Sequence, residues 1–463
     1  MEKTVTLLPL FLMLFLIKGI EGSIGVNYGT VADNLPPPSQ VARFLLDSTI
    51  LNRVKLYDTN PEILQAFAHT GIAIIVAVPN NLILNLANLK FSQQWVKTNI
   101  APHIPATNIV RIVVGNEVIS TTDNSVVSIL VPAMQALHAA LVGEDLDRRI
   151  KVSTPHSLGI LSSSSPPSSG RFKQGNIAHL IKQLLGFLRA TDSPFMINPY
   201  PFFGYSGDTL NYAMFRPNSG VFDEISHKNY TNMLDAQLDA TYTAMKQLGF
   251  SDVEIVIAET GWPSKGDPGQ IGVDINSARE FNVNLIKHVM SGLGTPLMPN
   301  KTFETYIFAL FNEDLKPGAT SERNFGLFRP DMTPVYNAGI LRHTDGSKPP
   351  ANWNPDRGVP VTSNGGKTWC IPTTGASEEV LQMNIDYVCG LGFDCEPIKK
   401  GGRCFYPDSV RAHATYAMNV YYQATGRHVY DCDFRRTGAI TSSNPGMNLS
   451  TYSTYIYIYI ILV

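Results

Sequence analysis

No cysteine occurs before Cys370 in this 463-residue chain, and all five cysteines lie between Cys370 and Cys432. The long N-terminal part therefore cannot rely on disulfide bonds and must be held by its own core. The C-terminal stretch is too short to bury a large core, so cysteine pairs are expected to stabilise it. This asymmetry predicts a large domain followed by a small disulfide-bonded module.

Charge and cofactor motifs are also scarce. Only 16% of the residues are charged and the formal net charge is −2, so no basic stripe suggests a nucleic-acid partner. The sequence contains no metal-ligand spacing, no P-loop and no dinucleotide-binding fingerprint, so we expect neither a metal nor a cofactor. His138, His156 and His179 lie in or beside apolar segments, which favours packing or surface positions over metal binding.

Long apolar runs occur only at the two ends of the chain. Lys3 and the apolar run 7–17 indicate a secretory signal peptide over residues 1–22, because the run is too short to span a membrane. In a secreted chain the sequons at Asn229, Asn300 and Asn448 become glycosylation sites. The tail, 445–463, is either a divergent segment or a GPI-anchor signal. Membrane attachment is expected only in the second case.

Strand-like and helix-like segments alternate between residues 23 and 342. Helical patterns include 177–188, 234–247 and 278–290, and eight strands are expected at 23–29, 53–57, 72–78, 109–114, 151–154, 195–198, 253–258 and 306–311. This alternation predicts an α/β fold, a (β/α)8 TIM barrel. An open doubly wound sheet also alternates, but the first strand is not followed by a Gly-rich phosphate loop. A linker, 343–367, then precedes the module, 368–444.

Two of the expected strands run into a glutamate. The apolar run 109–114 leads to Glu117, and the apolar run 255–258 leads to Glu259. Side chains at the carboxyl ends of barrel strands lie where TIM-barrel active sites are built. Hydrolysis of a glycosidic bond requires a pair of carboxyl groups, so the pattern predicts a glycoside hydrolase.

Five motifs, in one order, resemble the plant endo-1,3-β-glucanases of glycoside hydrolase family 17 over nearly all of residues 23–342. They are Ser23–Gly29, Val114–Glu117, Asn198–Phe203, Ala258–Pro263 and Glu304–Glu313. The resemblance implies a TIM barrel, a retaining mechanism and a β-1,3-glucan substrate such as callose. It also implies that Glu259 is the nucleophile and that Glu117 is the proton donor and acid/base.

Other side chains in or near these motifs are candidates for substrate binding. Asn116 could bond the sugar 2-hydroxyl, and Tyr200 could orient Glu259. Glu304, with Lys301 close by, could bind sugar hydroxyls or form a structural ion pair. Four aromatic residues could offer apolar faces to pyranose rings, with core packing as the alternative for the last two: Tyr28, Phe203, Trp262 and Phe311.

The C-terminal part resembles the X8 module, also called carbohydrate-binding module family 43. The resemblance rests on Trp369–Cys370, Asp386–Gly390, Cys395–Ile398, Gly401–Cys404, His413–Asn419, Tyr421–Gln423 and Cys432–Phe434. It implies the disulfides Cys370–Cys432 and Cys389–Cys395. Cys404 is left unpaired, because no cysteine lies near position 444. Four aromatic residues could form a sugar platform or the module's core: Tyr416, Tyr421, Tyr422 and Phe434.

Two other functions fit the same motifs. The chain could be a non-catalytic β-glucan- or callose-binding wall protein, or it could act on mixed-linkage 1,3-1,4-glucan or as a transglycosylase. The presence of both Glu117 and Glu259 favours hydrolysis. Loops such as 205–229 would set the linkage preference. We therefore expect a secreted, extracellular, monomeric enzyme of the cell wall that acts within β-1,3-glucan chains.

Overall fold

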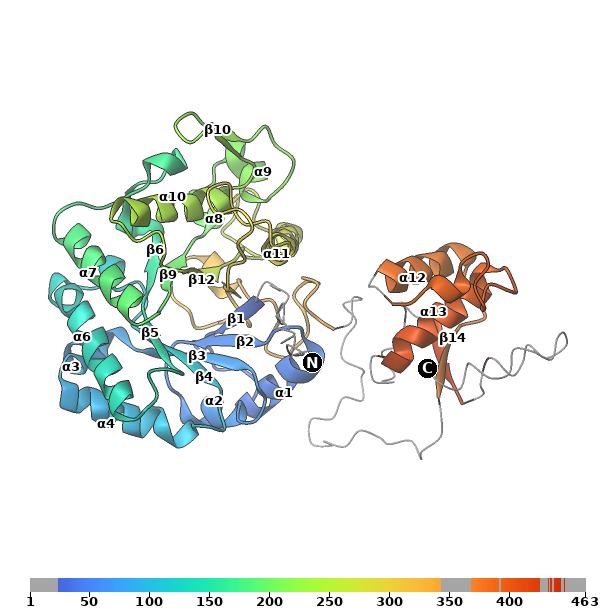
Figure 1. Cartoon of the computed structure of the whole chain (residues 1–463), viewed down its shortest axis with the longest axis horizontal. Coiled ribbons are helices and arrows are strands. Elements are labelled where there is room, and N and C mark those ends of the chain that lie inside the picture. The colour runs from blue at the N-terminus through green and yellow to red at the C-terminus, as the bar shows by residue number, and fades with distance from the viewer. Residues whose placement is uncertain are drawn as a thin grey trace, which may run out of the picture. The chain divides into compact units, whose positions relative to one another are not determined.

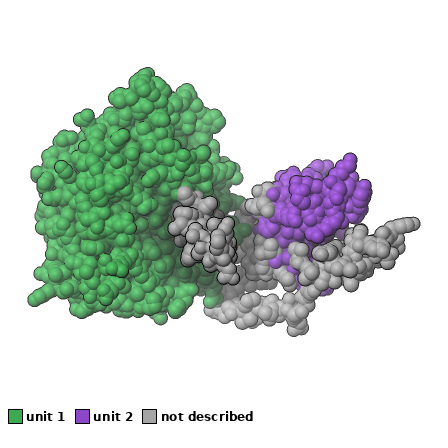
Figure 2. Space-filling view, in the orientation of Figure 1, with its two compact units in different colours: residues 1–351 green, residues 352–463 purple. Residues whose placement is uncertain are grey.

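The computed structural model describes residues 24–342, 368–390, 393–424, 432, 434, 437–442 and 445. The chain divides into two compact units, residues 1–351 and 352–463 (Figure 2). The expected signal peptide, the expected linker, Asn448 and the expected tail beyond Pro445 lie outside the described residues.

A nine-stranded parallel sheet forms the centre of the first unit (Figure 1), in the order β5-β4-β3-β2-β1-β13-β12-β9-β6. The predicted (β/α)8 fold class is confirmed. Its strands are β1 (Ile24–Tyr28), β2 (Arg53–Leu56), β3 (Ala73–Val78), β4 (Ile109–Val114), β5 (Lys151–Ser153), β6 (Pro155–Ser157), β9 (Phe195–Asn198), β12 (Ile255–Thr260) and β13 (Thr305–Ile307).

The barrel is closed by one continuous segment of chain. β5 pairs with β4 and β6 pairs with β9, and only Thr154 separates β5 from β6. The strand expected at 151–154 is therefore two short strands that together serve as one barrel position. The strand expected at 306–311 is also different, because β13 ends at Ile307.

Helices surround the sheet (Figure 1). Several begin at a side-chain cap: Asn88 accepts from the amides of Lys90 and Phe91, and Asp274 accepts from the amide of Ser277, as N-cap residues do. The helices are α1 (Pro38–Ser48), α2 (Pro61–Ala66), α3 (Ile83–Leu86), α4 (Leu89–Asn99), α5 (Val118–Thr121), α6 (Asn124–Gly143), α7 (Asn176–Ala190), α8 (Pro201–Gly204), α9 (Leu210–Ala213), α10 (Met233–Gln247) and α11 (Ile275–Met290). Two small antiparallel pairs are β7 (Leu161–Ser163) with β8 (Arg171–Phe172), and β10 (Val221–Asp223) with β11 (Lys228–Tyr230).

The barrel strands are buried on both faces, as the mainly apolar sequences of β3, β4 and β12 predict. Side chains alternate between the barrel interior and the layer that packs on the helices. Along β3, for example, Val76 and Val78 belong to the outer layer. The interior cluster is smaller and consists of Ile75, Ala77, Val113, Met196, Val256, Ala258 and Tyr306.

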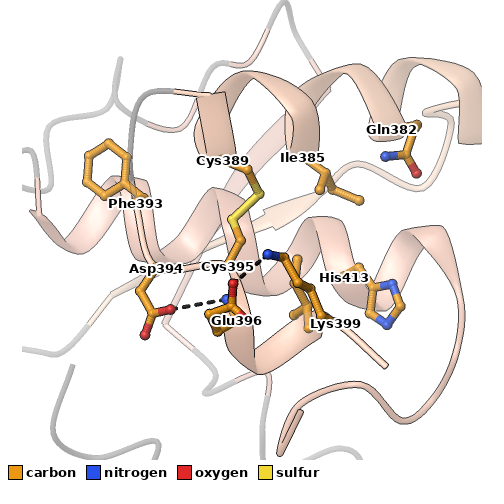
Figure 3. A pocket seen from close by; sticks show the side chains of 10 residues that line it. Gln382, Ile385, Cys389, Phe393, Asp394, Cys395, Glu396, Lys399 and His413 are labelled. Carbon is orange, nitrogen blue, oxygen red and sulfur yellow. Dashed lines mark hydrogen bonds and ion pairs between the residues drawn. A yellow bond between two sulfur atoms is a disulfide. The ribbon is translucent and has the colours of Figure 1, made fainter. Parts of the chain in front are cut away.

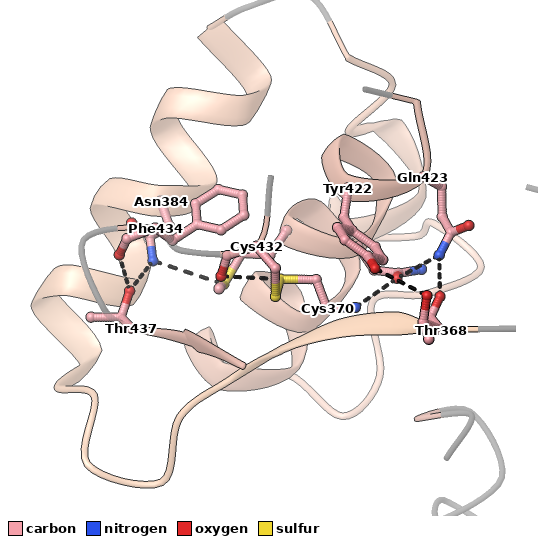
Figure 4. The surroundings of a disulfide bond; sticks show 10 residues. Thr368, Cys370, Asn384, Tyr422, Gln423, Cys432, Phe434 and Thr437 are labelled. Carbon is pink, nitrogen blue, oxygen red and sulfur yellow. Dashed lines mark hydrogen bonds between the residues drawn. A yellow bond between two sulfur atoms is a disulfide. The ribbon is translucent and has the colours of Figure 1, made fainter. Parts of the chain in front are cut away.

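The second unit contains two helices and a two-stranded antiparallel sheet. These are α12 (Glu378–Gly390), α13 (Val410–Ala424), β14 (Trp369–Pro372) and β15 (Gly438–Thr441). It contains both disulfides that the X8 resemblance implies, Cys370–Cys432 and Cys389–Cys395, and Cys404 is free. Figure 4 shows the first of these bonds beside β14, where the amide of Cys370 donates to Asn419.

Candidate active site

Glu259 reaches the barrel interior through an irregularity in β12. Ile257 pairs with Thr305 and Thr260 with Ile307, so β12 advances three residues where β13 advances two. Ala258 faces the barrel interior. In a regular strand, its neighbour Glu259 would therefore point to the other face, toward the helices. A β-bulge supplies the extra residue that turns a side chain to the other face. Glu259 consequently contacts Lys55, which projects inward from β2.

Glu117 is placed by a tight turn after β4. Gly115 has φ of +68°, and a Cβ there would lie 2.4 Å from Val118 and 2.5 Å from Asn80, so glycine is required. The Asn80 side chain accepts from the Asn116 amide at 2.8 Å and donates to the Asn116 carbonyl at 3.1 Å. Glu117, which lies immediately before α5, has φ of +53°. The turn directs the carboxyl group away from the strand.

Three polar side chains fix the environment of Glu259. Lys55 and Tyr57 donate to Oε1 at 2.9 and 2.8 Å, and Tyr200 donates to Oε2 at 3.2 Å. Burial alone would raise the pKa of Glu259, but the Lys55 cation and the hydrogen bonds from Lys55 and Tyr57 hold this pKa below its ordinary value. Glu259 is therefore kept ionised, as a nucleophilic carboxylate must be.

Glu117 is shifted in the opposite direction. Burial and the negative charge of Glu259 raise the pKa of Glu117, although Asn198, which donates to its Oε1 at 2.8 Å, opposes the shift. Two interacting carboxyl groups whose pKa values are pushed apart can act as an acid and a nucleophile in the same site. A pair of this kind works as acid and nucleophile only between its two pKa values, where one carboxyl group is protonated and the other is ionised.

Three of the predicted binding residues lie at this site or beside it. Tyr200 bonds Glu259, as expected. Asn116 Oδ1 is buried and has no hydrogen-bond partner among the described residues. Phe203 is 65% exposed, and its ring lies 5.2 Å from that of Tyr200. Phe203 therefore has a free apolar face next to Tyr200.

The interpretation of the other three aromatic residues as sugar platforms is wrong, because their rings are buried. Trp262 is 0% exposed, and its Nε1 donates to the Gly272 carbonyl at 2.8 Å. Tyr28 and Phe311 are each 2% exposed and pack edge to face at 6.0 Å. All three belong to the core that supports the site.

The placement of Glu304 and Lys301 at the site is also wrong. Glu304 precedes β13, so it lies at the amino end of the barrel, opposite the active-site end. Its Oε1 accepts from Arg111 at 2.9 Å, and Arg53 lies 3.6 Å from Oε2. Lys301 is exposed, and Glu304 pairs with the two arginines instead. Glu304 is a structural ion-pair residue.

Several polar residues of the site escaped the sequence analysis. Lys55 was detectable, because a lysine inside an apolar strand must find a buried partner. Asn27, Tyr57 and Asn198 are ordinary strand or strand-end residues whose role needs the closed barrel. A second group follows β13: Glu313 accepts from the Val31 amide at 2.9 Å, and Lys316 lies 3.6 Å from Glu322 and over the Phe308 ring.

The sequence predicts glycosylation sites and gives no indication of a metal site. Asn229 and Asn300 are exposed, so both sequons are open to a glycosylating enzyme. Within the part of the chain that the structure describes, no group of three or more His, Cys, Asp or Glu side chains could hold a metal ion.

The second unit has a pocket of about 470 Å³ (Figure 3). The Cys389–Cys395 disulfide, Ile385, Ile398 and Phe393 form its apolar lining. Its polar lining includes Glu396, which is paired with Lys399, and the full polar set is Gln382, Asp394, Glu396, Lys399 and His413. An apolar surface with a few polar groups at its edge suits a small neutral ligand.

The expected aromatic platform of the module is only partly present. Tyr422 is 1% exposed and bonds Thr368 at 3.0 Å, so it is core. Tyr421 packs edge to face on Phe393 and Phe434, with ring centroids 5.5 and 5.4 Å apart. Tyr416, Tyr421 and Phe434 are half-buried and belong to the rim of the same core.

A (β/α)8 barrel that carries two interacting glutamates, one with a raised and one with a lowered pKa, at its active-site end defines a glycoside hydrolase. Residues 24–340 match the family model of glycosyl hydrolases family 17, and residues 368–439 match the X8 domain. The chain belongs to glycosyl hydrolases family 17.

Relatives cover nearly the whole chain. This chain is 49% identical to the glucan endo-1,3-beta-glucosidase of Triticum aestivum over 456 residues. The aligned region covers 95% of this chain and 98% of that one. Glucan endo-1,3-beta-glucosidase 7 of Arabidopsis thaliana is 46% identical over 450 residues, or 96% and 87% of the two chains. The solved structure of CJP38, a beta-1,3-glucanase and pollen allergen of Cryptomeria japonica, has 43% identity and a TM-score of 0.65 over 69% of this chain and 99% of that one.

Proposed function

We propose that the chain hydrolyses internal β-1,3-glucosidic bonds of β-1,3-glucan by a retaining double displacement. Glu259 attacks the anomeric carbon and forms a glycosyl-enzyme, while Glu117 protonates the leaving oxygen. Glu117 then removes a proton from the water that releases the sugar. The observation that carries the proposal is the pair of interacting glutamates, one bonded to the buried Lys55 and the other to Asn198, whose pKa values are shifted in opposite directions.

The substrate part of the proposal is supported by the relatives, which are named for endo-1,3-β-glucosidase or β-1,3-glucanase activity. A non-catalytic wall protein would not need a lysine buried against one glutamate and an asparagine bonded to the other. Mixed-linkage glucan is the alternative substrate. A solved structure that is 39% identical, with a TM-score of 0.62, is one of two plant β-glucan endohydrolases with distinct substrate specificities. We also propose an extracellular, monomeric enzyme.

The test is hydrolysis of a soluble linear β-1,3-glucan by the full chain. We expect reducing ends to appear throughout the polymer, so that viscosity falls before glucose accumulates. Proton NMR of the first products is expected to show the β-anomer, followed by slow mutarotation, because two inversions retain configuration. Mixed-linkage and β-1,4-glucan serve as matched substrates. The α-anomer first would contradict the retaining mechanism, and hydrolysis of mixed-linkage glucan alone would contradict the linkage.

We further propose that the module's pocket binds the same polysaccharide. The Phe393 ring and the disulfide offer an apolar face, and Glu396, Lys399 and His413 offer hydrogen bonds at its edge. Sugars are recognised in this way, because a pyranose has an apolar face and a rim of hydroxyls. Such a pocket would hold the enzyme on insoluble glucan while the barrel cleaves it.

In the full chain, Phe393→Ala combined with Glu396→Gln is expected to weaken retention on insoluble β-1,3-glucan about tenfold, the equivalent of one lost ring contact. Hydrolysis of a soluble laminari-oligosaccharide should not change, because that reaction needs only the barrel. Tyr406→Ala is the control, since Tyr406 is 79% exposed and outside the pocket. Equal retention of both variants in a pull-down assay would place the module's binding surface elsewhere.

A further inference from the structure

The two carboxylate oxygens of Glu259 are bonded unequally. Oε1 accepts from Lys55 at 2.9 Å and from Tyr57 at 2.8 Å. Within the described residues, Oε2 accepts only from Tyr200, at 3.2 Å. A charge-assisted bond from an ammonium group is about twice as strong as a neutral one, so most of the hydrogen bonding to this carboxylate falls on one oxygen.

The surroundings of Lys55 hold its ammonium group against Oε1. Its side chain is 1% exposed, and its other polar contact is the Asn27 Oδ1 at 3.2 Å. The ammonium also lies 4.0 Å from the centre of the Tyr57 ring, a cation–π distance. A buried lysine without water must keep these partners. The position of Nζ is therefore fixed by contacts on three sides.

Asn27 has only one orientation that fits its surroundings. Its Nδ2 donates to the carbonyls of Ala258 and Tyr306, at 3.2 and 3.4 Å. Its Oδ1 must then face Lys55 and Tyr57. It accepts from Lys55 at 3.2 Å and lies 3.1 Å from the Tyr57 hydroxyl, whose single proton goes to Glu259. Because an amide has distinct donor and acceptor ends, Asn27 holds the Lys55 ammonium in place.

Taking Glu259 as the nucleophile proposed above, we propose that Lys55 and Tyr57 hold Oε1 and leave Oε2 as the attacking atom. A lone pair of Oε2 forms the bond to the anomeric carbon as the glycosidic C–O bond breaks. The leaving oxygen takes the proton from Glu117. Oε1 becomes the ester carbonyl oxygen and still accepts from Lys55 and Tyr57. When water attacks, the bond to Oε2 breaks, and Lys55 neutralises the returning carboxylate. Lys55 is thus a positioning residue in both steps.

The first test compares Lys55→Met with Lys55→Arg in the full chain. Removing one preorganised charge that stabilises the reacting group is expected to lower kcat/KM about 10²-fold or more with Lys55→Met. The effect should fall on kcat rather than KM. Lys55→Arg keeps a cation and should recover part of the rate. Lys97→Met is the control, because Lys97 makes a surface ion pair at 3.5 Å with Glu144.

The pH profile separates positioning from a general structural loss. The acidic limb of kcat/KM follows ionisation of Glu259, and loss of the Lys55 cation raises that pKa, so Lys55→Met should shift the limb to higher pH. Lys55→Arg should leave it near its original place. The other titratable groups that act on Glu259 or face it remain in both variants, and they are Tyr57, Tyr200, Glu117 and Lys316. An unshifted acidic limb in folded Lys55→Met would overturn the role of Lys55.

A second measurement does not depend on any variant. Wild-type enzyme is treated with a 2-deoxy-2-fluoro-laminaribiosyl fluoride, which forms the glycosyl-enzyme and then turns over slowly. A crystal structure of the adduct is expected to show the ester bond on the oxygen near Tyr200, with the carbonyl oxygen on Lys55. Attachment to the oxygen that faces Lys55 would overturn the inference alone. Labelling of a residue other than Glu259 would overturn the proposed nucleophile as well.

Discussion

Glu259→Gln is expected to lower kcat on soluble β-1,3-glucan about 10⁴-fold or more, because an amide cannot form the glycosyl-enzyme. The substitution also removes the anionic partner of the buried Lys55. The rate is measured as reducing-end release, with circular dichroism to show that the variant is folded. Glu62→Gln, an exposed residue in the first turn of α2, should keep the wild-type rate. A Glu259→Gln enzyme within tenfold of wild type would contradict the assignment.

Azide separates the roles of the two glutamates. With an aryl glycoside that needs no protonation to leave, Glu259→Ala plus azide should yield the α-glycosyl azide, because azide fills the space of the lost carboxylate and inverts the centre once. Glu117→Ala should still form the glycosyl-enzyme, which azide then opens to the β-product. The opposite pair of products would mean that the roles of Glu117 and Glu259 are exchanged.

Glu304→Gln is expected to reduce the free energy of unfolding by about 3–5 kcal/mol, the usual cost of removing one partner from a buried ion pair. Arg111 is 8% exposed and would lose its carboxylate at 2.9 Å. Urea unfolding at neutral pH measures the effect. Glu280→Gln is the matched control: its bond to Arg216 is shorter, at 2.7 Å, but more exposed, so we expect about 0–1 kcal/mol.

Lowering the pH should reduce the difference in the free energy of unfolding between wild type and Glu304→Gln. Burial alone would raise the pKa of Glu304, but Arg111 and Arg53 hold it below its ordinary value. A carboxyl group with a lowered folded-state pKa stabilises the protein above its unfolded pKa, and this contribution is lost as the pH falls through the folded pKa. KM of the folded variant should not change. A tenfold rise in KM would return Glu304 to the substrate-binding residues.

The sequence was informative where a residue's neighbours along the chain determine its position. The apolar strands and the glutamates at their carboxyl ends could be predicted, since a parallel strand buried on both faces has a distinctive composition. Glu117 and Tyr200 follow such strands within three residues, and Glu259 is the last but one residue of β12. Glu304 was misplaced although its position in the chain argued against the site. It precedes the last strand both as expected, 306–311, and as observed, 305–307, and a carboxylate before a strand lies at the opposite end of the barrel from one after it.

The remaining site residues depend on contacts across the barrel. Asn27 and Lys55 lie on neighbouring strands, whereas Lys55 and Glu259 are separated by 204 residues, and no local pattern pairs them. Burial of the aromatic residues has the same origin. Trp262 follows Glu259 by three positions, yet its ring is enclosed by Phe202, Tyr205 and Phe281. Local sequence places such a residue near the site but does not determine which side it faces.

The irregular pairing of β12 with β13 makes the sheet less regular, but it also turns the Glu259 side chain into the barrel, where activity needs it. Regularity of the sheet and activity of the protein therefore compete. A designer who restored even pairing, with Glu259 in place of Thr260 opposite Ile307, would improve the sheet's geometry. The barrel would keep its core, because Val256 and Ala258 already face inward. The carboxylate of Glu259, however, would turn toward the helices. A version of this fold with a regular sheet would be stable, and it would have no enzymatic activity.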